Sequence, residues 1–200
     1  LVFFGTRPEA LKLAPVIHEL RKERCFDTRA ILTSQHRQMT DQVVKLFRLQ
    51  VDADLNLMRE DQTLASLSGR LLNSLGKVFE KFRPTLVMVQ GDTTTAFMVA
   101  LYSFYNRIPV AHVEAGLRSY EKYHPFPEEI NRRLISHLAD FHFAQTDSAR
   151  QNLIKEGIAK KRIAVTGNTG IDALLWIRSQ LEPSYPRFRK IDFSKRVILL

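Results

Sequence analysis

Cysteine is almost absent from this chain of 200 residues, because Cys25 is its only one. A single cysteine cannot form a disulfide within the chain, and it argues against zinc sites built from cysteines. Long hydrophobic runs are absent too: no apolar stretch reaches the roughly 18 residues of a membrane span, and no basic-then-apolar leader precedes the first expected strand. We therefore expect a cytoplasmic protein with no membrane partner.

Positive charge is in excess but is not concentrated. The 30 Lys and Arg residues outnumber the 21 Asp and Glu residues, which gives a formal net charge of +9. These cations are scattered, and no pattern of interleaved aromatic and basic residues accompanies them, so we expect no nucleic-acid partner. Nucleotide phosphates would explain the surplus about as well as nucleic acid, and general solubility explains it better than either.

Short β-rich runs alternate with longer helical patterns, which is typical of a parallel sheet covered by helices on both faces. Apolar residues between the runs recur at helical spacing, and the stripe from Leu64 to Phe79 is expected to be core. The predicted fold class is α/β, a doubly wound, Rossmann-like parallel sheet whose ligands bind beyond the carboxyl ends of the strands. The expected strands are Leu1 to Phe4, Arg29 to Thr33, Leu86 to Gln90, Val110 to Val113, Phe141 to Ala144 and Ile163 to Val165.

Both ends of the chain fall within expected strands. Leu1 opens one strand, and Val197 to Leu200 read as the beginning of another. The polar, proline-containing stretch between them and the last helix is typical of an interdomain linker. We therefore expect residues 1–181 to form an amino-terminal Rossmann-like domain, and residues 182–200 to be a linker and the first strand of a further domain.

The first strand ends in Gly5-Thr6-Arg7-Pro8-Glu9. Gly5 permits a tight turn, and Pro8 suits the first turn of a helix. This helix N-terminus, with Arg7 and Lys12 nearby, offers a place for phosphate, although a routine turn explains the motif equally well. The dinucleotide pattern G-x-G-x-x-G and the P-loop ending G-K-[ST] are both absent.

Polar clusters follow the next two strands. The first cluster is Ser34 to Met39, and it has two interpretations. Either His36 serves as a ligand or proton donor, or the cluster forms a turn before a helix that begins near Thr40. In Gly91 to Thr95, Asp92 either caps the following helix or places a carboxylate at the binding edge. Spacing alone leaves both alternatives open.

The segment Val110 to Arg118 places Glu114 and Arg118 just after an apolar strand. Farther on, Pro127 is predicted as a first helical residue, and Arg132 follows Glu128 at the spacing of an ordinary i,i+4 ion pair. An ion pair between Glu128 and Arg132 would not explain why Glu114 and Arg118 lie just after an apolar strand. Carboxylates from separate strand ends that converge with arginine are what acid/base chemistry on an anionic substrate needs.

The remaining polar residues are expected to be structural. After the last strand, Asn168 or Thr169 is predicted to cap a helix. His18, His137 and His142 fall within helical or strand patterns, so packed or exposed structural histidines are favoured over ligands. No His, Asp and Glu spacing resembles a metal site, and we expect no metal.

Taken together, these motifs resemble the non-hydrolysing UDP-N-acetylglucosamine 2-epimerases. The resemblance implies an amino-terminal lobe of a two-domain, glycosyltransferase-B-like fold. It also implies reversible conversion of UDP-N-acetylglucosamine to UDP-N-acetylmannosamine without a cofactor, in a full-length homodimer that serves polysaccharide biosynthesis. The motifs are Gly5 to Glu9, Gln35-His36, Gly91 to Thr95, His112 to Arg118, Pro127 to Glu129, Asn131-Arg132 and Thr166 to Thr169.

The resemblance also assigns residues. The implied reaction eliminates UDP to give 2-acetamidoglucal and then adds UDP back, and the isolated 200-residue chain is expected to be inactive. Alternatives are a hydrolysing 2-epimerase that releases free N-acetylmannosamine, a nucleotide-sugar glycosyltransferase, or a non-catalytic binding module. The implied catalytic residues are Asp92, Glu114, Glu128 and Arg132, those for substrate binding are Arg7, Lys12 and Arg118, and those for an allosteric UDP-sugar site are Gln35, His36, Gln38 and Gln62.

Overall fold

A seven-stranded parallel sheet forms the centre of the protein, in a computed structural model that describes residues 1–33, 37–57, 59, 61–180, 191–192 and 194–197. The strand order is β3-β2-β1-β4-β5-β6-β7, and every pairing is parallel. This confirms the predicted α/β class. The strands are β1 (Val2–Phe4), β2 (Ala30–Leu32), β3 (Ala53–Asp54), β4 (Val87–Gln90), β5 (Val110–Ala115), β6 (Phe141–Ala144) and β7 (Ile163–Val165).

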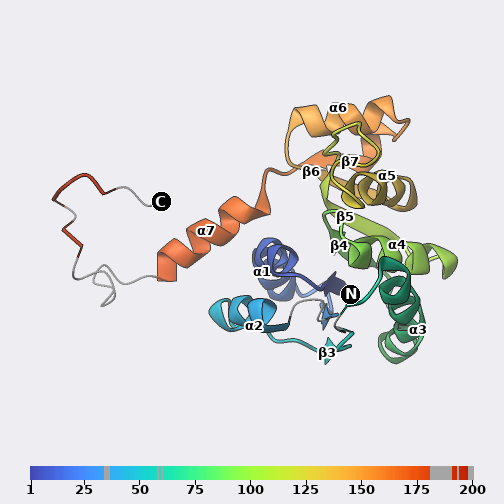
Figure 1. The fold of residues 1–200 in the computed structure, drawn as a ribbon, viewed down its shortest axis with the longest axis horizontal. Helices are drawn as coiled ribbons and strands as arrows, with labels where there is room; N and C mark the ends of the chain where they lie inside the picture. Colours follow the sequence, from blue (N-terminus) through green and yellow to red (C-terminus); the bar gives the residue numbers. More distant parts are fainter. Residues whose placement is uncertain (34–36, 58, 60, 181–190, 193, 198–200) are drawn as a thin grey trace.

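Helices cover both faces of the sheet (Figure 1). On one face α1 (Arg7–Lys22) lies between α2 (Arg37–Leu46) and α7 (Thr169–Gln180). On the other, α4 (Thr94–Tyr105) lies between α3 (Leu64–Phe82) and α5 (Glu128–Leu138). Near the β7 edge, α6 (Asp147–Lys155) contacts β5, β6 and β7, and the short 3-10 helix η1 (Lys160–Arg162) leads into β7.

The central strands are buried on both sides, which is why their sequences are almost continuously apolar. In β1, Val2 and Phe4 pack into the core beneath α1, whereas Phe3 packs beneath α3 and α4. Fully burying one such phenylalanine stabilises the fold by about 1.5–3 kcal/mol. The predicted apolar stripe on α3 is core from Leu67 to Phe79, but Leu64 is 42% exposed because it starts the helix at the surface.

The strand order reverses between β1 and β4. From β1 the chain crosses to β2 on one side, and from β4 it crosses to β5 on the other. The connections that follow these two strands therefore run to opposite faces of the sheet, and doubly wound folds bind ligands beyond the carboxyl ends of the strands at such a point. Residues 5–6 and 91–93 form these turns.

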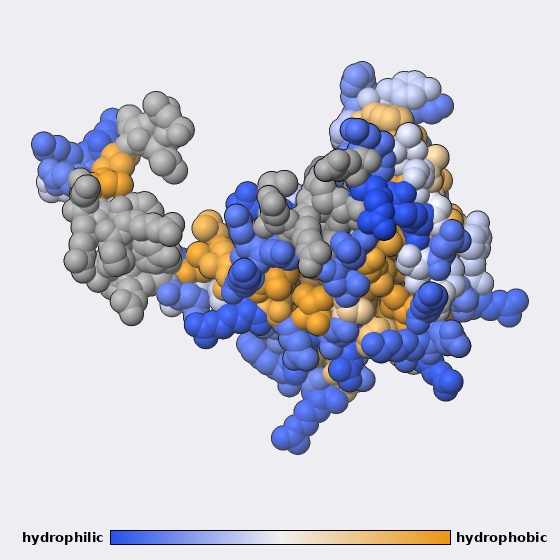
Figure 2. All heavy atoms as spheres, turned by 60° about the horizontal axis from the view of Figure 1, so that its bottom comes forward, coloured by the Kyte–Doolittle hydropathy of each residue, from blue (hydrophilic) through white to orange (hydrophobic). Residues whose placement is uncertain are grey.

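α7 leaves apolar side chains at the surface. Ile171, Leu174 and Leu175 are each more than half exposed, whereas Trp176 of the same helix stacks on Phe47. Figure 2 shows hydrophobic atoms reaching the molecular surface between hydrophilic ones. Among the described residues, no helix is both long enough and apolar enough to cross a membrane.

Candidate active site

Glu114 lies in a bulge of β5. The strand continues two residues past its predicted end, and its register against β6 shifts between Val113 and Ala115. Glu114 has a backbone φ of +67°, a left-handed conformation that is uncommon for a residue other than glycine. Bulges of this kind re-aim a side chain, often beside active sites. Here the carboxylate Oε2 accepts hydrogen bonds from Lys12 Nζ at 2.5 Å and from Gln90 Nε2.

Asp92 lies in the turn after β4, the strand next to β5. The predicted alternative that Asp92 caps the next helix is wrong, because Thr93 is the N-cap of α4 and its Oγ1 accepts from Ala96 N at 3.0 Å. Both residue types cap well, and the turn ends one residue later than the spacing suggested. The Asp92 carboxylate is therefore not used for capping, and it pairs with Arg132 Nη2 at 2.5 Å.

Arg132 reaches Asp92 from α5, and its pairing differs from the sequence prediction. Its ion pairs among the described residues are with Asp92 and, at 3.7 Å, with Glu129, so the expected pair with Glu128 is not formed. Pro127 is the N-cap residue rather than the first helical residue, which makes Glu128 the first residue of α5. Glu128 lies half-buried there.

The carboxylates influence one another. Burial raises the pKa of Asp92, the charges of Glu114 and Glu128 raise it further, and the cation of Arg132 opposes them. A carboxyl group whose pKa is perturbed by burial and by specific charged neighbours, at a ligand-binding edge, is a candidate for proton transfer. The sequence-predicted residues Asp92, Glu114, Glu128, Arg132 and Lys12 are thus brought to one place.

The turn after β1 is held by a buried carboxylate. Thr6 is the N-cap of α1 and forms a capping box with Glu9, and Pro8 lies in the first helical turn as predicted. Glu9 Oε2 accepts from Gly5 N at 2.9 Å and from Thr6 N at 2.8 Å. These two N–H groups are therefore not available to a phosphate, and the predicted place for phosphate at this helix N-terminus stays a prediction. The exposed Arg7, which makes no ion pair with any described residue, and Lys12 remain as the cations of this edge.

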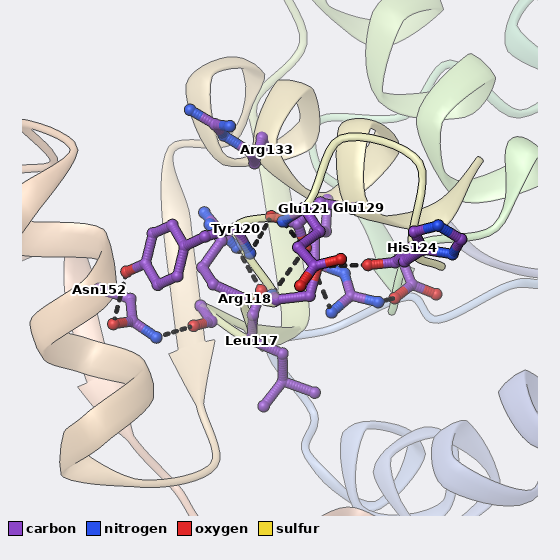
Figure 3. A network of polar contacts seen from close by, with 12 residues as sticks. Leu117, Arg118, Tyr120, Glu121, His124, Glu129, Arg133 and Asn152 are labelled. Atoms are coloured by element: carbon purple, nitrogen blue, oxygen red, sulfur yellow. Dashed lines mark hydrogen bonds and ion pairs between the residues drawn. The ribbon is translucent and has the colours of Figure 1, made fainter. Parts of the chain in front are cut away.

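Arg118 lies outside this cluster. Its side chain is fully buried, and its Nε and Nη2 donate to Glu156 at 2.8 and 2.7 Å. Nη2 also donates to Ser136 Oγ, and Nη1 donates to the carbonyl oxygen of Leu117. Figure 3 shows this network beside the loop that leads to α5, with Tyr120 pointing at Asn152 of α6. These contacts hold Arg118 in place, and its implied part in substrate binding stays a prediction.

The same loop is fastened by Glu129, which is completely buried. Its carboxylate accepts from Ser119 N at 3.0 Å and from Tyr120 N at 3.2 Å (Figure 3). Because Glu129 also lies 3.7 Å from Arg132, the loop and the arginine that faces Asp92 share one anchor.

The family model described as UDP-N-acetylglucosamine 2-epimerase matches residues 18–200. The chain belongs to this family. It is 48% identical to the UDP-N-acetylglucosamine 2-epimerase of Escherichia coli K12 over all of its length and 55% of the relative's. It thus spans about half the length of the curated relatives that it matches.

Solved structures of 2-epimerases superpose on the chain and share the glycosyltransferase-B-like fold. The structure from Neisseria meningitidis, bound to UDP-GlcNAc, aligns with a TM-score of 0.85 and 47% identity over 93% of this chain and 53% of the other. The structure from Methanocaldococcus jannaschii, in complex with UDP-GlcNAc and UDP, aligns with a TM-score of 0.82 and 40% identity over 88% and 48% of the two chains.

Of the allosteric residues that the 2-epimerase resemblance implied, Gln35 and His36 lie outside the described residues, as does the side chain of Gln38. Gln62 is half-buried, and its Oε1 accepts a hydrogen bond from Arg70 Nη2. The allosteric site therefore stays a prediction.

Other residues have the structural roles that the sequence predicted. Asn168 Oδ1 accepts from Gly170 N at 2.9 Å and so caps α7. His18 hydrogen-bonds to the carbonyl oxygen of Phe47 and stacks on Trp176, and His142 is buried. In the described part of the chain, no three His, Cys, Asp or Glu side chains are grouped as ligands for a metal ion.

Sequence reasoning assigned no role to the residues that hold the candidate site in place. Gln90 binds Glu114, Asn131 Nδ2 donates to the Asp92 carbonyl oxygen at 2.9 Å, and His112 donates from Nε2 to the Gly91 carbonyl oxygen at 2.7 Å. Burial lowers the pKa of His112 to about 3, so the ring is neutral at physiological pH. A polar residue inside an otherwise apolar strand, as His112 and Gln90 are, was the available signal, because buried polar groups need partners.

Proposed function

We propose that this chain supplies the amino-terminal half of a non-hydrolysing UDP-N-acetylglucosamine 2-epimerase, which reversibly converts UDP-N-acetylglucosamine to UDP-N-acetylmannosamine. The observation that carries the proposal is the convergence of Asp92 with Arg132 and of Glu114 with Lys12 at the point where the strand order reverses. Relatives solved with UDP-GlcNAc support the class of substrate.

The chemistry explains why carboxylates are needed. The C2 proton lies next to no carbonyl, so its direct removal would leave an unstabilised carbanion. Elimination avoids this state: the C2 proton leaves, the C1–oxygen bond to UDP breaks, and 2-acetamidoglucal forms. UDP then adds back to C1, and a proton is delivered to the opposite face of C2. Groups that accept and donate protons must therefore flank the sugar, and positioned carboxyl groups accelerate such steps by about 10²–10⁴-fold.

The cluster contains groups suited to these steps. Glu114 is held by Lys12 and Gln90 through Oε2, which fixes the direction of Oε1. Burial raises the pKa of Asp92, which brings its protonated form closer to neutral pH than that of a solvated aspartate. We include Glu128 as a third carboxylate and Arg7 and Lys12 as cations for the diphosphate, since guanidinium and ammonium groups both bind phosphate oxygens. Arg118 is not included, because its donors are already used.

The products test this function. The full-length protein is incubated with UDP-N-acetylglucosamine alone in deuterium oxide and followed by NMR. We expect UDP-N-acetylmannosamine that carries deuterium at C2. Free N-acetylmannosamine would instead indicate a hydrolysing 2-epimerase, and unchanged substrate until an acceptor is added would indicate a glycosyltransferase.

We propose further that the 200-residue chain alone is inactive, because it spans 55% of the length of its Escherichia coli relative and positioning of the substrate contributes much of the catalysis. Turnover by the isolated chain near that of the full-length protein would contradict this. The full-length protein is proposed to be a homodimer, which its molar mass in solution tests.

A further inference from the structure

We propose that Glu9 and Thr93 form a clasp that positions the active site, so that Glu9 is a positioning residue rather than only a helix cap. The inference rests on the proposed epimerase function for its catalytic readout. The clasp is the hydrogen bond that Thr93 Oγ1 donates to Glu9 Oε1 at 2.6 Å, which joins the turn after β1 to the turn after β4.

Glu9 does more than capping requires. Its Oε2 accepts from Gly5 N, Thr6 N and Thr6 Oγ1, and these local contacts complete the capping box of α1. Oε1 instead reaches a residue 84 positions along the chain. The side chain is 1% exposed, and burial raises its pKa. Burying a carboxylate is costly unless every oxygen is satisfied, so one placed between two turns indicates that the link between them matters.

Thr93 has two tasks as well. Its hydroxyl oxygen accepts from Ala96 N to cap α4, and its proton goes to Glu9. Asp92 directly precedes Thr93, so the same bond fixes the backbone that carries the Asp92 carboxylate. The bonds from His112 to the Gly91 carbonyl and from Asn131 to the Asp92 carbonyl fix this turn from the other side.

The clasp closes a ring around the site. Lys12 lies three residues after Glu9 on α1 and binds Glu114 of β5. Glu114 in turn accepts from Gln90 of β4, which runs directly into Asp92 and Thr93. Opening the bond between Thr93 and Glu9 would therefore let α1, with Arg7 and Lys12, shift relative to Asp92. A misplacement of about 1 Å costs roughly 100-fold in rate when reacting groups must be aligned.

The test compares three threonine variants in the full-length protein. Thr93→Val removes the hydroxyl, and Thr93→Ser retains it. Thr146→Val is the matched control, because Thr146 caps α6 through the same bond, to Ala149 N, without a distant partner among the contacts described. The measurements are kcat and KM for UDP-N-acetylglucosamine, the melting temperature, and amide hydrogen exchange in the turns at residues 5–6 and 91–93.

We expect Thr93→Val to lower kcat by roughly 10- to 100-fold, with a smaller change in KM, and to speed amide exchange in both turns. Thr93→Ser should stay within about threefold of the wild type. Thr146→Val should keep the wild-type kcat and lower the melting temperature by less than Thr93→Val, because it removes a helix cap alone. If Thr93→Val does not fold, Glu9→Gln replaces it, because an amide has one acceptor oxygen in place of two.

A kcat for Thr93→Val within twofold of the wild type, with a loss of melting temperature equal to that of Thr146→Val, would overturn the proposal. Turnover by the wild-type protein tests the proposed function separately. If the wild type did not epimerise, exchange in the turn at residues 5–6 would still decide the clasp, because loss of the α4 cap alone would not reach that turn.

Discussion

Two clusters of arginine and carboxylate lie close together in the chain. They differ in how many of their hydrogen-bonding groups have partners. In the first, Asp92 pairs with Arg132, and the Asp92 side chain keeps 27% of its surface exposed. In the second, Arg118 pairs with Glu156, and the arginine side chain has no exposed surface. Both arginines follow the β5 strand, and neither the residue type nor the spacing separates them.

The difference lies in unused hydrogen-bonding capacity. Arg118 donates to Glu156, to Ser136 and to a carbonyl oxygen, so every nitrogen of its guanidinium group has a partner. Arg132 Nε has no partner among the described residues, although it is buried. A satisfied network stabilises one arrangement, whereas a partly satisfied one at an open edge retains groups for a ligand. Whether every guanidinium nitrogen has a hydrogen-bond partner therefore separates a structural cluster from one that is able to bind a ligand.

The largest effect is expected at Glu114. Glu114→Gln keeps the shape of the side chain and removes the proton-transfer group, so epimerisation by the full-length protein should fall by about 10³-fold or more. The rate of UDP-N-acetylmannosamine formation measures this. Asp147→Asn, which changes an exposed carboxylate of α6, is the control and should leave the rate unchanged.

Gly116 lies between Glu114 and Arg118 in the chain, and its substitution should lower the free energy of unfolding strongly. Its φ is +90°, and an added Cβ would lie 2.2 Å from the Ala149 carbonyl oxygen. We expect Gly116→Ala to lower the free energy of unfolding by more than about 3 kcal/mol, because strain and a backbone clash add. Gly157→Ala, at a φ of +88° with nothing within 4 Å of the added Cβ, should cost only about 1–2 kcal/mol in denaturant unfolding.

The two arginines should respond in opposite ways. Arg118→Met should cost about 3 kcal/mol of unfolding free energy, because Glu156 loses its main partner in a largely buried site, while the kcat of the folded protein stays near that of the wild type. Arg132→Met should lower kcat by at least about 100-fold at a smaller cost in stability. Equal losses of kcat in both variants would remove the distinction between the clusters.

The effect with the least bearing on catalysis concerns pH. Burial lowers the pKa of His112 to about 3 from its ordinary value of 6.5, so below about pH 6.5 the unfolded chain binds a proton that the folded chain does not. The contribution of neutral His112 to the free energy of unfolding is therefore complete above pH 6.5. It falls by about 1.4 kcal/mol per pH unit as the pH drops toward 3. Unfolding of His112→Gln between pH 7 and 4 should show a correspondingly flatter dependence. Parallel curves for the two proteins would contradict it.

The fold was largely predictable, because hydrophobic periodicity reports burial directly. Six of the strands follow from apolar runs; the bounds of β6 and β7 are as expected, and those of the other four moved by one or two residues. β3 was missed because it consists only of Ala53 and Asp54 at the edge of the sheet, which is too short to show a pattern. The bulge at Glu114 was also missed, since it depends on pairing with β6.

The candidate site was predictable as a set of positions but not as a set of contacts. Local spacing placed Asp92 and Glu114 near strand ends. Their partners come from distant segments: Lys12 lies 102 residues from Glu114 in the chain. Local spacing also favoured the wrong pair for Arg132, because an i,i+4 neighbour is visible in sequence and a partner on another strand is not. No role was predicted for Glu9, because its partner Thr93 lies 84 residues away in the chain.

The central claim is that the cluster at Asp92 performs proton transfer at C2 of the sugar. The most direct measurement is deuterium incorporation at C2 by full-length Asp92→Asn in deuterium oxide, at substrate concentrations that saturate the variant. We predict that UDP-N-acetylglucosamine still binds and that C2 exchange falls by about 100-fold or more. Exchange at the wild-type rate by the variant would contradict the account.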